Sequence, residues 1–181
     1  THRAQHVMVV AQVALSGDSG NGHAVVERDA DGRLQLHDAV VTVPARVAAP
    51  VLAIPALDLL GTIEIQIGHA RLLGAWPADA AGTASWRNAA VAGAAQAQLG
   101  ELRATFASTT DGGIAGTVVD LGGPLEVAGT FAARAGQYEA QARLAARGNN
   151  PQVTEALQYV GQPRADGSRD LEIRGRQLNL F

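Results

Sequence analysis

Histidine is the side chain most often used as a metal ligand or general base near neutral pH. The sequence holds five: His2, His6, His23, His37 and His69. No pair is spaced i, i+4 within a stretch that reads as a helix, and none is clustered with acidic residues at ligand spacing. We interpret them as surface or strand-face residues and expect no metal site.

Four aspartates, Asp111, Asp120, Asp166 and Asp170, stand beside predicted turns, where Asp is favoured for backbone reasons. A calcium loop needs several converging carboxylates, and the segment Asp111-Gly112-Gly113 offers one. The glycine-rich segments do not follow a strand and open a helix, so they do not indicate a phosphate site. The serines lack a nucleophile elbow. We therefore predict no catalytic residues, no metal, no cofactor and no enzyme activity.

The amino-acid composition narrows the classes of protein to which this chain can belong. A chain of 181 residues suits one domain, and its net charge of −3 argues against nucleic acid as a partner. Cys is absent, which excludes disulfides and thiolate metal sites. The longest apolar run, around residues 47–60, contains Pro50, Pro55 and Asp58 and cannot span a bilayer. Since the chain lacks an initiating Met and a signal sequence, we expect it to be a fragment of something longer.

Alternating apolar and polar residues, divided by Gly- and Asp-containing turns about ten residues apart, predict an antiparallel meander. Strands are expected from Val7 to Leu15 and from His23 to Arg28. A short helical turn is expected near Ala45 to Val51, and a polar turn after Trp76-Pro77. The fold class is therefore mainly β, a curved antiparallel sheet, open or partly closed like a barrel, with one helix in the C-terminal half.

Large rings among small neighbours read as core anchors, because they bury far more apolar area than Ala. Trp86 has this setting, and Leu102, Ala104 and Phe106 alternate with polar residues after it. Phe131 ends a similar alternating strand. We predict Trp86, Phe106 and Phe131 as anchors of the core.

The sequence predicts one clear helix, from Pro151 to Val160. Asn150 can cap it, and Pro151 suits its first turn. Val153, Ala156, Leu157 and Val160 form an i, i+3, i+4, i+7 stripe that ends at Gly161. We predict that this stripe packs across an open end or face of the sheet.

The final strand, Leu171 to Phe181, is the predicted edge of the sheet and a place where a partner strand could add. Its candidate contact residues are Leu171, Ile173, Arg174, Arg176, Leu178, Leu180 and Phe181. The alternative is that the tail pairs internally and buries Leu178 and Leu180.

Several segments, read in order, resemble a known family. They are Gly61–Ile65, Gly82 with Trp86–Ala89, Leu99-Gly100, Asp120–Gly123, Gly129–Phe131 and the strand Leu171–Gly175. Their order and spacing resemble the protein N family of the bacterial type II secretion system, from Gly61 to the end and more weakly before it. The curved open sheet is also similar to that of AsmA-type envelope proteins.

The resemblance implies one periplasmic β-rich domain over residues 1–181, held to the inner membrane of a Gram-negative bacterium by an anchor outside this chain. It implies a non-enzymatic accessory role in type II secretion, with other secretion components as partners, either the inner-membrane platform or the secretin. Self-association is left open. The alternative is an envelope domain with a groove for a lipid or other apolar ligand; a third is a structural β-domain from an outer-membrane or adhesin system.

Overall fold

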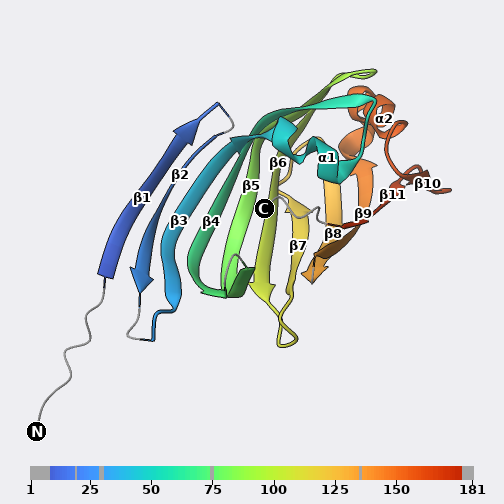
Figure 1. The fold of residues 1–181 in the computed structure, drawn as a ribbon. Helices are drawn as coiled ribbons and strands as arrows, with labels where there is room; N and C mark the ends of the chain where they lie inside the picture. Colours follow the sequence, from blue (N-terminus) through green and yellow to red (C-terminus); the bar gives the residue numbers. More distant parts are fainter. Residues whose placement is uncertain (1–8, 19, 29–30, 74–75, 135, 177–181) are drawn as a thin grey trace, which may run out of the picture.

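The computed structural model describes residues 9–18, 20–28, 31–73, 76–134 and 136–176. These residues form an 11-stranded antiparallel sheet in which each strand pairs with the next along the chain, except that β11 lies between β9 and β10. The sheet is strongly curved and stays open, since β1 at one side and β10 at the other do not pair (Figure 1). The predicted mainly β, curved antiparallel fold is confirmed.

The strands have the following bounds: β1 Val9–Gly17, β2 Gly20–Arg28, β3 Leu34–Pro44, β4 Leu57–Leu73, β5 Trp76–Gly93, β6 Ala97–Ser108, β7 Ile114–Asp120, β8 Leu125–Arg134, β9 Gln137–Ala146, β10 Gln162–Pro163 and β11 Arg169–Arg176. The helical elements are the 3₁₀ turns η1 Ala45–Ala48 and η2 Arg147–Asn149, and the helices α1 Ala49–Leu52 and α2 Pro151–Leu157. The helical turn expected near residues 45–51 therefore corresponds to η1 and α1.

One predicted turn is wrong. The small and polar residues after Trp76-Pro77 belong to β5, which runs unbroken to Gly93 and pairs with β4 on one side and β6 on the other. The composition of this segment is that of a turn, but tertiary pairing overrides such weak local preferences. Two long strands, β4 and β5, therefore form the centre of the sheet.

Three neighbouring positions in β4, β5 and β6 have positive φ values and interrupt the regular pairing of these strands. Gly61, Asn88 and Gly100 have φ values of 97°, 50° and 95°, and the strand registers shift beside them. A Cβ at Gly61 would lie 2.5 Å from the carbonyl oxygens of Arg87 and Asn88. β-Bulges of this kind bend a strand and increase its twist. They also switch which residues of β6 point inward, so that Leu99 before Gly100 and Leu102 after it are both buried.

The two faces of the sheet differ in chemistry. We define the concave face by a cross-strand row that is directly paired across β4 to β9 and β11: Ile67, Gly82, Phe106, Gly116, Phe131, Ala140 and Ile173. Glycines stand beside rings in this row. A Cβ at Gly82 would lie 2.7 Å from Phe106 Cζ, and one at Gly116 would lie 2.5 Å from Phe131 Cζ. The aromatic rings therefore cover the neighbouring glycines instead of projecting freely.

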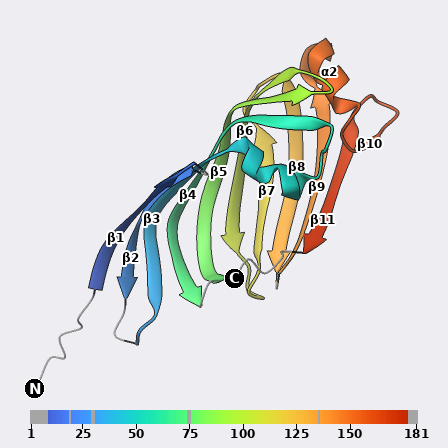
Figure 2. The same cartoon turned by 45° about the horizontal axis from the view of Figure 1, so that its top comes forward.

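The helical elements cover one end of this concave face (Figures 1 and 2). The connection between β3 and β4 crosses the open side, so that α1 contacts β11, while α2 packs on β6 and β9. Asn150 Oδ1 accepts the Val153 amide at 3.1 Å, as expected of an N-cap, and Pro151 begins the helix. The main hydrophobic core lies between these elements and the sheet from β4 to β9.

Candidate functional site

The first candidate site is an apolar cavity of about 230 Å³ between the concave face and the helices. Its walls are almost entirely aliphatic and aromatic. They include Leu52 and Ile54 from the β3–β4 connection, Leu157 and Val160 from the α2 region, and Trp86, Val118, Phe131, Ala142, Leu171 and Ile173 from the sheet. Such a space can accept an alkyl chain or another apolar group, because its walls offer few hydrogen-bonding partners.

The three predicted core anchors contribute to this site to different degrees. Trp86 and Phe131 are both partly buried and line the cavity. Trp86 also packs against the core, and its indole Nε1 donates to the carbonyl oxygen of Leu60 at 2.8 Å. Phe106 is partly buried and lies over Gly82, outside the cavity wall. Trp86 is thus partly buried instead of fully enclosed.

The predicted helix stripe lies in the core. Val153 is fully buried, and Ala156, Leu157 and Val160 are each less than a tenth exposed. The helix itself ends at Leu157, three residues before the expected end, and Val160 follows in a turn. The stripe closes one end of the cavity, so the same residues that hold the helix on the sheet also form the wall of the site.

The second candidate site is the outer edge of the final strand. β11 pairs with β9 along its whole length, whereas β10 pairs only with Arg169 and Asp170. Among the described residues, positions 171–176 therefore have a strand on one side only; we call these positions the β11 edge. Leu171, Ile173, Arg174 and Arg176 of the predicted contact set lie on it. Leu178, Leu180 and Phe181 lie outside the described residues.

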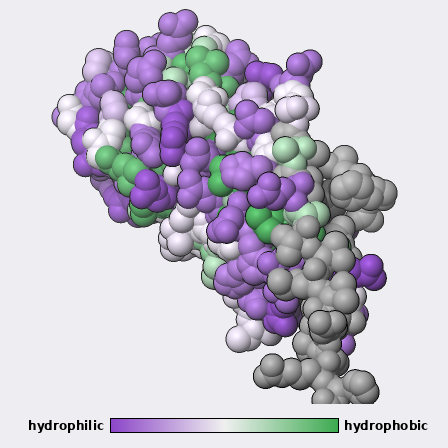
Figure 3. Space-filling model, turned by 90° about the vertical axis from the view of Figure 1, so that its left-hand side faces the viewer, coloured by the Kyte–Doolittle hydropathy of each residue, from purple (hydrophilic) through white to green (hydrophobic). Residues whose placement is uncertain are grey.

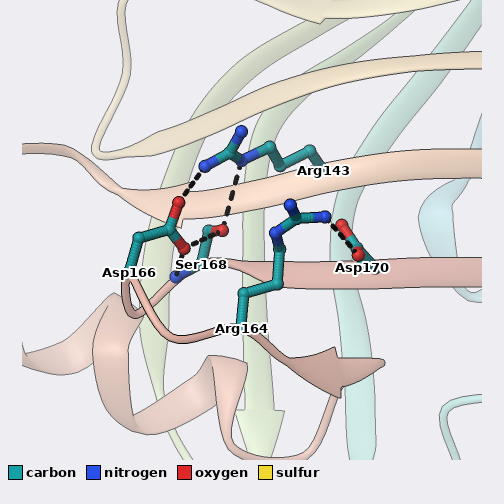
Figure 4. Close-up of polar contacts among 5 residues, drawn as sticks. All are labelled: Arg143, Arg164, Asp166, Ser168 and Asp170. Carbon is teal, nitrogen blue, oxygen red and sulfur yellow. Dashed lines mark hydrogen bonds and ion pairs between the residues drawn. The ribbon is translucent and has the colours of Figure 1, made fainter.

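A polar cluster fixes the short hairpin that covers the start of β11 (Figure 4). Arg143 on β9 pairs with Asp166 in the hairpin turn, and its Nε donates to Ser168 Oγ at 3.2 Å. Arg164 pairs with Asp170 at 2.7 Å. The Ser168 hydroxyl and amide, aided by Arg143, lower the pKa of Asp166, and the hydrogen bond to Asp170 raises the pKa of Arg164. The cluster therefore stays ionised at neutral pH and holds β10 over the first two residues of β11.

Two further turn aspartates form ion pairs with arginines that follow later in the chain, one at the end of β8 and one just after β9. Asp111, between β6 and β7, pairs with Arg134 at 2.7 Å, and Asp120, at the end of β7, pairs with Arg147 at 2.5 Å. The Thr109 hydroxyl lowers the pKa of Asp111. Partial burial opposes ionisation of Asp120, but the amides of Val127 and Gly122, with Arg147, lower its pKa overall.

These Asp–Arg pairs were missed by the sequence analysis, which assigned the aspartates to turn formation alone. A weak signal existed for three of them, because Arg134 follows Asp111, Arg147 follows Asp120 and Asp166 follows Arg143 by 23 to 27 residues, whereas Arg164 and Asp170 are six residues apart. Their arrangement is that of structural ties between turns and strands. None of them lines the apolar cavity.

Within the part of the chain that the structure describes, no group of three or more His, Asp or Glu side chains could hold a metal ion. His37 and His69 are paired across β3 and β4, and His37 Nε2 lies 3.5 Å from Glu27 Oε2, but these three side chains do not form such a group. In the same described segments, no helix has the length and apolar character needed to cross a membrane.

Comparison with known proteins identifies one family. A family model for the type II secretion system (T2SS) protein N matches residues 6–172, nearly the whole chain. Neither the search of curated proteins nor the search of solved structures gave a significant match. The match extends well before Gly61, where the sequence resemblance was weak, and the chain belongs to the type II secretion system protein N family.

Proposed function

We propose that this chain is a non-enzymatic accessory component of the type II secretion machinery, acting as a periplasmic protein-interaction module that an anchor outside this sequence holds to the inner membrane. Family membership associates the chain with type II protein secretion and supports this role. The proposed partners are other components of the machine, in the inner-membrane platform or the secretin.

The observation that carries the interaction role is the β11 edge. Its backbone groups can pair with an added strand, and main-chain pairing of this kind gives affinity in many peptide-binding domains. Glu172, Arg174 and Arg176 alternate along it, and the first two are exposed and paired with each other. Charges on an edge strand oppose indiscriminate pairing, so a partner strand needs complementary charges to bind there.

Site-specific photo-crosslinking in cells tests this role. A photoreactive residue at Arg174 in the full-length protein should give an adduct with an identified secretion component. The matched control is Arg103, an exposed position on the central strand β6. The charge reversal Arg174→Glu should reduce both the adduct at a neighbouring probe and the export of a type II substrate. Equal adducts from Arg174 and Arg103, or unchanged export, would contradict the proposal.

A second function, binding of a lipid or other apolar ligand, is favoured by the apolar cavity. The cavity is bordered by Trp86 and Phe131, and its polar lining is limited to Thr130 and Gln141. Burying alkyl carbons there would stabilise a complex by about 0.8 kcal/mol per methylene. The cavity volume of about 230 Å³ suits a short alkyl segment better than a long lipid chain.

The ligand hypothesis is tested by binding of a fluorescent fatty acid to the purified chain. Ala142→Phe places a ring in the cavity and should weaken binding at least tenfold, whereas Ala128→Phe, at an exposed position on β8, should not. Circular dichroism and thermal melting check that both variants fold, and native mass spectrometry of the unmodified chain detects copurified lipid. Absence of both probe binding and copurified lipid would refute this function without affecting the secretion role.

A further inference from the structure

The opposite edge of the sheet differs sharply from the β11 edge. β1 pairs with β2 through nine consecutive residue pairs, from Val9–Arg28 to Gly17–Gly20, with no shift in register. Within the described residues it pairs with no other strand. We call the other side of Val9–Gly17 the β1 edge. It is longer than the β11 edge, and no hairpin such as β10 covers it among the residues that the structure describes.

The sequence of β1 carries none of the features that block edge-to-edge pairing. Val-Val-Ala-Gln-Val-Ala-Leu-Ser-Gly contains no charged residue and no proline, and its regular register excludes a bulge. Natural edge strands are normally protected by one of these devices, because their free N–H and C=O groups recruit other strands. In the described part of the chain, β11 is protected by charge and by β10, whereas β1 has neither protection.

We propose that the β1 edge is a self-association surface, at which two copies of this chain pair β1 with β1 in antiparallel fashion to give a two-fold dimer. A two-fold axis at Val13 pairs Ala11 with Leu15 and Gln12 with Ala14 of the second copy. In this register, odd-numbered residues of one copy pair with odd-numbered residues of the other. Because alternate residues point to opposite faces of a strand, the same face of each sheet continues into that of its partner. Closed two-fold dimers are the commonest homo-oligomers, and this contact uses the same nine residues twice.

The surface around β1 indicates how such a contact is held together. Viewed from the β1 side, the molecule is mostly hydrophilic, with separate small hydrophobic patches (Figure 3). Ala11, Gln12 and Ala14 are exposed. The coloured part of this view shows no broad apolar patch, and we expect main-chain hydrogen bonds to carry the association. This inference does not depend on the proposed secretion role.

Cysteine cross-linking tests the register directly, because the chain has no natural Cys. Residues directly opposite across an antiparallel pair have Cα atoms about 4.5–5.5 Å apart, which suits a disulfide. Val13→Cys should therefore form a disulfide-linked dimer on mild oxidation. Arg174→Cys on the β11 edge is the control and should remain uncross-linked under the same conditions. A dimer from Arg174→Cys and none from Val13→Cys would overturn the proposal.

Light scattering across a range of protein concentrations provides the second measurement. The unmodified chain should reach the mass of two copies, and Ala14→Glu should return it to one, since the new charge blocks edge pairing. Ala14 is exposed, so this variant should melt at the same temperature as the unmodified chain when both are dilute. Ala128→Glu on β8 is the matched control and should stay dimeric. A single-chain mass for the unmodified protein at 100 µM or above, or a dimeric Ala14→Glu, refutes the proposal.

Discussion

Trp86 combines two roles at the residue scale, since it packs against the core and borders the cavity. Trp86→Ala should lower the free energy of unfolding by about 2–3 kcal/mol, less than the 3–5 kcal/mol typical of fully buried rings. Trp86→Phe should cost about 1 kcal/mol, because it keeps most of the apolar contact and loses the hydrogen bond to Leu60. Urea unfolding followed by circular dichroism measures both.

Arg87→Ala is the neighbouring control for this pair of variants. Arg87 is exposed and pairs with Glu64 at 3.0 Å, so its loss should cost under about 1 kcal/mol. A cost for Trp86→Ala no larger than that for Arg87→Ala would show that Trp86 is not a core anchor.

Asp120 makes the stability of the fold depend on acidity. Its folded-state pKa is lowered, so its ionised form stabilises the fold above the ordinary Asp value of about 3.9. That contribution disappears as the pH falls through the lower folded-state pKa. The melting-temperature difference between the unmodified chain and Asp120→Asn should therefore be constant above about pH 5 and shrink below about pH 4. Asp58→Asn, at an exposed position on β4, controls for the change in charge. A difference that stays constant down to pH 2 would contradict this assignment.

At the scale of elements, α2 is expected to depend on its buried stripe more than on its own helical tendency. The helix has only seven residues, and isolated helices of that length are unstable in water. Leu157→Asp places a charge in the core and should lower the melting temperature by 10 °C or more, or prevent folding. Gln158→Asp, one residue later and exposed, should change it by less than about 3 °C. Equal melting temperatures for the two variants would mean that α2 does not contribute to the core.

At the scale of the whole molecule, the sheet is continuous but its core is not evenly distributed. Most buried residues belong to β4–β9 and the α2 region, whereas Ala39 is the one buried residue among those of β1, β2 and β3 whose side chains the structure describes. Regions with few buried contacts open at lower free energy than the rest. Hydrogen exchange in dilute protein should therefore protect β5, β6 and β8 at least tenfold more than β2 and β3. Uniform protection would instead indicate a single cooperative unit from β1 to β11.

The sequence by itself determined the order of the strands from β1 to β9, because these consecutive strands pair in a meander whose Gly- and Asp-containing turns are largely visible in the chain. It did not determine that β11 lies between β9 and β10. The inward sets of β7, β8 and β9 follow from simple alternation, and Asn150-Pro151 marks the start of α2. The family was also recognisable from its ordered Gly and Trp positions.

Only the tertiary structure decided which surfaces are covered. Strand alternation gives the apolar side of each strand, but it does not say where a distant helix will pack. The bends at Gly61, Asn88 and Gly100, the crossing of α1 to β11 and the pairing of Asp120 with Arg147 join residues from separate strands and depend on the curvature of the complete sheet. The covering of the start of β11 by β10 is likewise a property of the assembled sheet, since whether a strand lies at an edge depends on its neighbours and not on its own residues.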